Sequence, residues 1–119
     1  MPTKNKTSVR IAIRNAQKKF FGTGVFLLLK NIDETGSINA ACEKMGMAYS
    51  KAWRMLKDAS DGFGFDIITT QKGGADGGRT MLTFEGRLIV DRFAKIQSEI
   101  SEITEREINL MWKEINEAK

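Results

Sequence analysis

The chain has 119 residues, with 19 Lys and Arg against 15 Asp and Glu, a net charge of +4 and no histidine. This length predicts one domain with a modest core, and the positive charge permits a polyanionic partner without requiring one. Without histidine, Cys–His and Ser–His nucleophile pairs and His/Cys metal clusters are excluded, so we expect neither an enzyme nor a metal site.

The apolar runs of this chain are short. The longest, Val25–Leu29, falls far below the length that spans a bilayer, and the first ten residues lack the apolar core of a signal peptide. Cys42 is the single cysteine and cannot form an internal disulfide. We therefore expect Cys42 to be a small core residue in a protein of a reducing compartment, the cytoplasm, with no membrane partner.

The N-terminal stretch predicts a loose arm followed by a small hairpin. Residues Met1–Ser8 are short, polar and basic. From Val9 to Arg14 apolar side chains alternate with basic or small ones, which predicts a half-buried strand. Asn15 and Ala16 can turn the chain, so that residues 18–21 pair back as a second strand.

The next segment predicts three helices, the last two joined by a tight turn. Residues 22–35 place an apolar face every three or four positions, Gly36 ends this helix, and Ser37 is a suitable N-cap for a helix to Met45. After Gly46 a further helix starts near Ala48 and is broken by the glycines of residues 60–64. This is the pattern of a helix-turn-helix, and we expect Trp53 to pack in the core beside Ala52 and Leu56.

The opposite face of that last helix is polar and basic, and we identify it as the DNA-reading face. Arg54 could pair bidentately with a guanine, whereas Lys57 is better placed for a phosphate. A solvated face with no partner is the alternative. The candidate contacts on this helix are Tyr49, Ser50, Lys51, Arg54 and Lys57.

A β-hairpin wing is predicted after the helix-turn-helix. Residues 65–70 and 80–82 read as strands, and residues 72–79 contain four glycines, which predicts a flexible turn. Lys72 and Arg79 flank this turn and could contact phosphates, or could simply sit at a hairpin tip without a partner. The turn lacks the Gly-Lys-Ser/Thr ending of a phosphate-binding loop.

One long helix is predicted to close the chain, capped by Thr83 and running to about Glu117. Its apolar positions follow a coiled-coil seam as far as Ile103 and then shift phase at Glu107. A helix of about 34 residues is about 50 Å long, more than the small domain can cover, so a second copy is expected to cover it. The expected dimer residues are Ile89, Phe93, Ile96, Ile100, Ile103, Ile108 and Trp112.

Four motifs in this order resemble the winged-helix domain of the ModE-type transcriptional regulators, which are molybdate-responsive and LysR-like in their DNA-binding half. The resemblance covers about residues 22–93. The motifs are GSINAA at Gly36–Ala41, GMAYSKAW at Gly46–Trp53, GGADGG at Gly73–Gly78 and LTFEG at Leu82–Gly86.

Two departures from the family pattern limit what the resemblance implies. Ala48 replaces the usual serine, so the last helix of the helix-turn-helix lacks its N-cap side chain. The separate molybdate-binding domain of the family is not expected in this chain. The resemblance thus implies DNA binding, and Ser37 could hold a phosphate at its helix N-terminus or serve as a cap alone.

These observations predict a mainly α winged helix-turn-helix with an N-terminal β-hairpin and a long C-terminal dimerisation helix. We expect residues 1–83 to form the DNA-binding domain and residues 84–119 the linker and dimerisation helix. The predicted function is a sequence-specific, homodimeric transcriptional regulator that binds double-stranded DNA and needs no cofactor. The alternative is a protein-interaction module that docks through the long helix.

Overall fold

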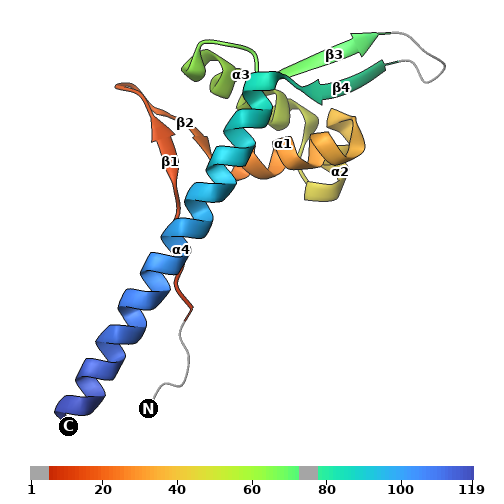
Figure 1. The fold of residues 1–119 in the computed structure, drawn as a ribbon. Coiled ribbons are helices and arrows are strands. Elements are labelled where there is room, and N and C mark those ends of the chain that lie inside the picture. The colour runs from red at the N-terminus through yellow and green to blue at the C-terminus, as the bar shows by residue number, and fades with distance from the viewer. Residues whose placement is uncertain (1–5, 73–77) are drawn as a thin grey trace.

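The computed structural model describes residues 6–72 and 78–119 and has the predicted fold (Figure 1). It is a mainly α winged helix-turn-helix with an N-terminal hairpin and a long C-terminal helix, in the order β1-β2-α1-α2-α3-β3-β4-α4. The molecule measures 68 × 33 × 24 Å because α4 projects from the body. The start of the predicted arm, residues 1–5, and the predicted glycine-rich tip, residues 73–77, lie outside the described residues.

The hairpin joins β1 (Ala12–Arg14) to β2 (Lys19–Gly22) in antiparallel order. Its turn forms where predicted, since the Asn15 side-chain carbonyl accepts two backbone N–H bonds within the turn, at 2.8 and 3.0 Å. The first strand is shorter than predicted and leaves Val9 outside, 44 % exposed. The reason is pairing: the last residue of β2 lies opposite the first of β1, so residues 9–11 have no strand beside them.

Three helices form the body, with α1 (Thr23–Thr35) at its centre against α2 (Ile38–Met45) and α3 (Tyr49–Phe63). The predicted boundary between α1 and α2 is confirmed. Gly36 ends α1 in the left-handed region with φ 74°, and the Ser37 hydroxyl accepts the Ala40 N–H at 3.1 Å as the N-cap of α2. Cys42 is buried on the inner face of α2, as predicted.

α3 ends within the predicted residues 60–64, at Phe63 with Gly64 as its left-handed C-cap, but the first of the two glycines, Gly62, lies inside the helix. A Cβ at position 62 would lie 2.1 Å from Cγ of Phe20, which belongs to β2. Glycine is therefore needed at this position for the close approach of an aromatic ring, and it does not end the helix.

The wing consists of β3 (Ile68–Lys72) and β4 (Gly78–Leu82), an antiparallel pair. β3 begins three residues later than the predicted start at Phe65, whose side chain is 38 % exposed. One backbone bond joins the wing to the turn after α1, and a second closes the base of the wing. The Thr80 N–H donates to the Gly36 carbonyl at 3.0 Å, and the Thr83 N–H donates to the Ile67 carbonyl at 3.1 Å.

The core is a single apolar cluster in which aromatic rings join the hairpin to α1 and α4. Phe93 of α4 is 2 % exposed, and its ring lies 5.1 Å from that of Phe21 and 4.9 Å from that of Phe26, centroid to centroid. Phe93 was predicted at a dimer interface, but in this structure the chain's own core covers it. A residue at this position of the 3.5-residue repeat could serve either a dimer interface or the chain's own core. Only the packing of the hairpin and α1 against α4 distinguishes these two roles.

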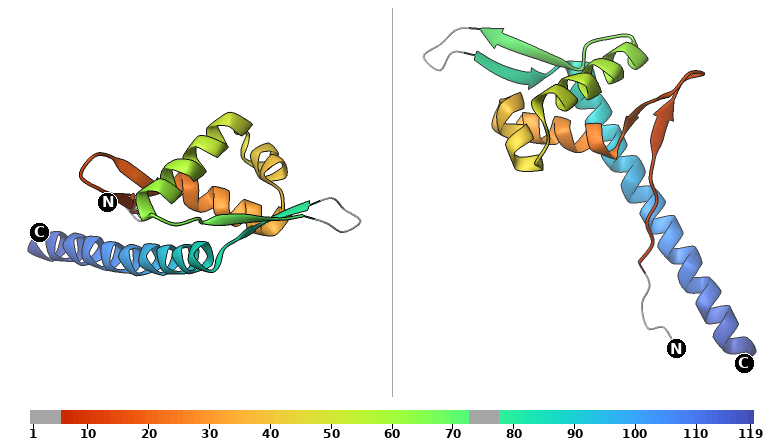
Figure 2. Two further views of the ribbon diagram at one scale, coloured as in Figure 1. Left: turned by 90° about the horizontal axis from the view of Figure 1, so that it is seen from above. Right: turned by 180° about the vertical axis from the view of Figure 1, so that it is seen from behind.

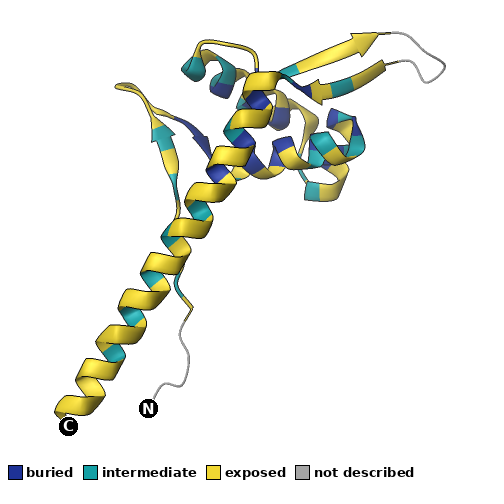
Figure 3. Cartoon of the chain, viewed as in Figure 1, coloured by how far each residue is buried: buried dark blue, intermediate teal, exposed yellow. Residues whose placement is uncertain are grey.

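α4 (Phe84–Ala118) is the predicted long helix, capped by the Thr83 hydroxyl, which accepts the Gly86 N–H at 2.9 Å. Beyond its first turns it leaves the body, and Figure 3 shows its far part mostly exposed. Two side chains of the predicted seam, Ile96 and Ile103, are 43 % and 51 % exposed. In residues 6–72 and 78–119, no helix combines the length and the apolar character needed to cross a bilayer.

One bidentate ion pair ties α4 to α1. The Arg87 guanidinium donates to the two carboxylate oxygens of Asp33 at 2.8 and 2.6 Å. This hydrogen bonding, helped by the positive charges of Arg87 and Arg79, holds the pKa of Asp33 below its ordinary value of 3.8, although burial opposes the shift. The pKa of Asp33 is therefore lower in the folded than in the unfolded chain. The ion pair stabilises the fold fully at pH values above the unfolded pKa, and this stabilisation is lost as the pH falls through the folded pKa.

We therefore expect Arg87→Ala to lower the free energy of unfolding at neutral pH by at most about 1 kcal/mol, since both side chains are partly exposed. The difference from wild type should vanish in acid, where Asp33 is protonated. Urea unfolding at both pH values measures it, with Arg92→Ala, an exposed arginine of the same helix, as the control. A difference that persists unchanged in acid would show that Arg87 acts through packing instead.

Candidate nucleic-acid interface

The turn between α2 and α3 sets the direction of α3. The Gly46 N–H donates to the Cys42 and Glu43 carbonyls, and the Met47 N–H donates to the Cys42 carbonyl at 2.9 Å. These bonds use the free carbonyls at the C-terminus of α2 and fix a short turn. α3 then begins after Ala48, which as predicted supplies no side-chain cap.

Ala48→Ser should restore that cap. A serine hydroxyl at this N-cap can accept an N–H of the first turn of α3, and we expect the free energy of unfolding to rise by about 0.5–2 kcal/mol. Thermal or urea unfolding measures the gain. Ala48→Val serves as the control, because it enlarges the side chain without providing an acceptor. Equal stability of the serine and valine variants would contradict the capping argument.

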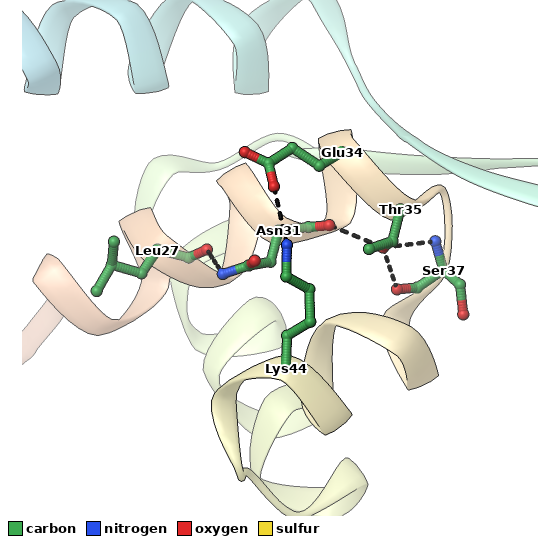
Figure 4. A network of polar contacts seen from close by, with 6 residues as sticks. All are labelled: Leu27, Asn31, Glu34, Thr35, Ser37 and Lys44. Atoms are coloured by element: carbon green, nitrogen blue, oxygen red, sulfur yellow. Dashed lines mark hydrogen bonds and ion pairs between the residues drawn. The ribbon is translucent and has the colours of Figure 1, made fainter.

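Side chains at the α1–α2 turn hold the start of α2 in place (Figure 4). The Thr35 hydroxyl donates to the Asn31 carbonyl at 2.7 Å and accepts the Ser37 N–H at 3.3 Å. Lys44, at the far end of α2, bonds Glu34 of α1 at 3.1 Å. The Thr35 bonds hold the backbone at Ser37, and the exposed Lys44–Glu34 pair adds a contact between α1 and the far end of α2.

Ser37, Tyr49 and Arg79, three of the predicted DNA contacts, line one hollow of about 280 Å³ between the start of α2, α3 and the wing. They come from distant parts of the chain, and the Thr80–Gly36 backbone bond brings them together. A Cβ at position 36 would lie 2.8 Å from Cζ of Arg79, so the guanidinium rests directly over the turn. The hollow thus combines a helix N-terminus, a hydroxyl and a cation, which suits a phosphate.

Two further predicted contacts, Arg54 and Lys57, line a larger groove between α3 and β3, with a volume of about 700 Å³. Lys57 makes an exposed ion pair with Asp61 at 3.2 Å, one turn on. Asp66 also lines the groove, so its positive character is concentrated at Arg54. Lys57 is therefore less available to a phosphate than the sequence suggested.

The remaining predicted contacts lie on exposed surface without being gathered into a hollow. Ser50 and Lys51 are exposed in the first turn of α3, and Lys72 is exposed at the end of β3. Within the described part of the chain, Lys51 and Arg54 form no ion pair. Their charges are available to an external anion.

Trp53 was predicted to pack in the core, and this prediction is wrong, because its side chain is 44 % exposed. The core face of α3 is formed instead by Ala52, Leu56 and Ala59, whose small side chains let the helix lie close to the body. Trp53 points to the edge that faces the wing, with its ring edge-on to Tyr49 at 6.2 Å. The sequence carries no clear signal for this, because the helical neighbours of Trp53 are mixed: Ser50 and Lys57 are polar, whereas Tyr49 and Leu56 are apolar.

The fold and these residues together define a class: a winged helix-turn-helix whose second helix and wing enclose an open, partly cationic surface. Comparison with known proteins finds relatives of this chain. No protein-family model matches the chain. It is similar to the molybdenum-pterin-binding protein MopB of Rhodobacter capsulatus, with 29 % identity over 86 residues, which is 70 % of this chain and 32 % of that protein.

Two molybdenum transport proteins ModE are also similar. The protein of Herbaspirillum seropedicae is 43 % identical over 58 residues, 49 % of this chain and 22 % of its own length. That of Azotobacter vinelandii is 30 % identical over 79 residues, 66 % of this chain and 29 % of its own length. The chain spans less than a third of each relative, and the similarities support a relation to the ModE and Mop type of protein.

Proposed function

We propose that this chain binds double-stranded DNA as a sequence-specific transcriptional regulator. The main support for this proposal is that Lys51 and Arg54 are exposed on the second helix of a helix-turn-helix, without an ion pair to any described residue. That helix type enters the major groove with its first turns against the base edges. The hollow that holds Ser37 and Arg79 lies beside it, as a phosphate site next to a reading helix would.

The similarity to ModE proteins supports the same proposal. Three of the four motifs that resemble the ModE-type winged helix fall on the start of α2, on the turn and start of α3, and on the end of β4 with the start of α4, whereas the glycine-rich motif lies outside the described residues except for Gly78. We assign no molybdate site to this chain, and no catalytic role, and we place its action in the cytoplasm. Residues 1–83 would bind DNA, and residues 84–119 would join two copies.

The apolar side chains along α4 support pairing of two copies through that helix: Ile96 and Ile103 are exposed, Ile100, Ile108 and Trp112 are half-buried, and Ile89 packs partly against the core. The residues proposed for this contact are Ile89, Ile96, Ile100, Ile103, Ile108 and Trp112, with Phe93 left to the core. The wing and the far end of α4 lie at opposite ends of the molecule in both views of Figure 2. Paired α4 helices would therefore leave both reading helices free, and the half-sites should lie about one DNA turn apart, near 34 Å, or a multiple of it.

A gel shift against random duplex DNA at low salt, beside light scattering, tests the proposal. We expect a dimer whose affinity falls steeply as salt is raised, because neutralised phosphates release counterions. A monomer without DNA affinity would instead favour the alternative function, a winged-helix module that docks on another protein. The exposed apolar residues of α4 support that alternative, because they could also contact another protein.

Ile103→Glu should separate the two copies. Ile103 is 51 % exposed in the single chain, and a carboxylate buried in a helix seam would be desolvated without a partner. We expect a dimer-to-monomer shift in light scattering and weaker binding to a two-half-site duplex. Ser101→Glu places the same charge on an exposed position of the same helix and should leave the mass unchanged. If Ile103→Glu remained dimeric, the seam would have to lie elsewhere.

A further inference from the structure

We propose that Trp53 is a DNA contact of this chain, packing its indole ring on a deoxyribose of the strand that lies between α3 and the wing. This inference rests on the proposed DNA binding and adds a residue to it. Trp53 is a large apolar side chain that a folded chain would ordinarily bury, yet it is 44 % exposed. No described residue accepts a hydrogen bond from its indole N–H, and its neighbour Tyr49 is 45 % exposed.

The position of Trp53 carries the argument. Trp53 and Thr70 line both the α3–β3 groove and the hollow beside α2, so together they form the ridge between the two depressions. Arg54 lies in the groove on one side of the ridge, and Arg79 lies in the hollow on the other side. The surface thus alternates between a cation, an apolar ring and a second cation.

A DNA strand presents the matching sequence of groups. Its phosphates carry the negative charge, and the deoxyribose between two phosphates offers an apolar face. With a base read by Arg54 on one side of the ridge and a phosphate near Arg79 on the other, the sugar between them would rest on the indole ring, and the indole N–H could donate to a phosphate oxygen. The carboxylates of Asp61 and Asp66 line the same groove. They repel a polyanion, so the strand should pass over the Arg54 side.

This contact is apolar and to the backbone, which sets its expected behaviour. Trp53→Ala should weaken binding about tenfold on two duplexes of unrelated sequence. A loss of this size is expected if DNA covers roughly half of the exposed indole surface in the wild-type complex, because alanine loses that burial. The slope of affinity against salt should not change, because no phosphate neutralisation is lost. Trp53→Phe keeps a ring on the ridge and should recover most of the affinity.

The experiment compares wild type, Trp53→Ala, Trp53→Phe, Arg54→Ala and Phe84→Ala by titration with both duplexes, after thermal unfolding has shown that each variant is folded. Phe84 is the matched control, since its ring is 79 % exposed and it lines neither depression. We expect Phe84→Ala to bind as wild type does. In wild type, saturating duplex should also quench tryptophan emission and reduce its access to acrylamide, a change that Trp53→Phe should lack.

The outcomes separate this inference from the proposed function. If Trp53→Ala binds within about twofold of wild type while Arg54→Ala is weakened, DNA binding stands and the Trp53 contact is wrong. A loss confined to one of the two sequences would also overturn it, because a sugar contact is independent of sequence. If wild type binds neither duplex at low salt, the proposed function and this inference fail together.

Discussion

Arg54→Ala is expected to weaken binding to the preferred duplex by about 1–3 kcal/mol and to relax the preference at one base pair. Arg54 is exposed on α3, and its guanidinium can present two N–H groups to the O6 and N7 atoms of a guanine. Alanine removes both donors and leaves the helix intact. Selection of bound sequences from a random pool identifies the duplex, and titrations on it and on single-base variants measure the loss.

Lys72→Ala is the comparison that gives the Arg54 result its meaning. Lys72 is exposed at the end of β3, and we expect it to contact a phosphate of the DNA backbone and no base edge. Its loss should weaken all sequences alike and reduce the salt slope by about one unit. A double variant that binds duplex DNA as tightly as wild type would exclude this surface as the interface.

Gly86→Ala is expected to destabilise the fold, against the usual effect of that substitution in a helix. Alanine normally favours a helix by about 1 kcal/mol over glycine. Here a Cβ would lie 2.1 Å from the backbone oxygen of Ile67, and the Thr83 cap holds the start of α4 in the same place. A backbone atom cannot swing aside, so we expect a net loss of about 1–3 kcal/mol or more by urea unfolding.

Gly24→Ala is the matched control for Gly86→Ala. Position 24 also lies in a helix, α1, but the nearest atom to an added Cβ is the terminal methyl of Met55, at 3.2 Å. The flexible Met55 side chain can move, so Gly24→Ala should be neutral or stabilising. If both variants were equally stable, the close approach of α4 to Ile67 would not be what requires glycine at position 86.

Much of this fold could be predicted because its signals are local. The Ser37 cap and the end of α1 at Gly36 depend on groups within a few residues, as does the Asn15 turn, and the sequence prediction located all three. Apolar periodicity likewise placed the helices and the length of α4. The exposed basic face of α3 follows from the same periodicity, since the opposite face is apolar.

The candidate site was only partly predictable, because its shape depends on contacts between distant segments. Ser37 and Arg79 were each proposed from the sequence, but the bond from the wing to Gly36 is what puts them in one hollow. Trp53 was misplaced because helical periodicity does not say whether Ala52 or its neighbour turns toward the body.

The sequence by itself determined where most helices begin and end, which face of α3 is charged, and that α4 is too long for one small domain to cover. The tertiary structure alone decided that Trp53 lies between two depressions, that Phe93 serves the chain's own core, and that α3 continues through Gly62 under the ring of Phe20. Caps and periodicity act over one or two helical turns, whereas these positions are set by which surfaces meet when the hairpin, α1 and the wing pack together.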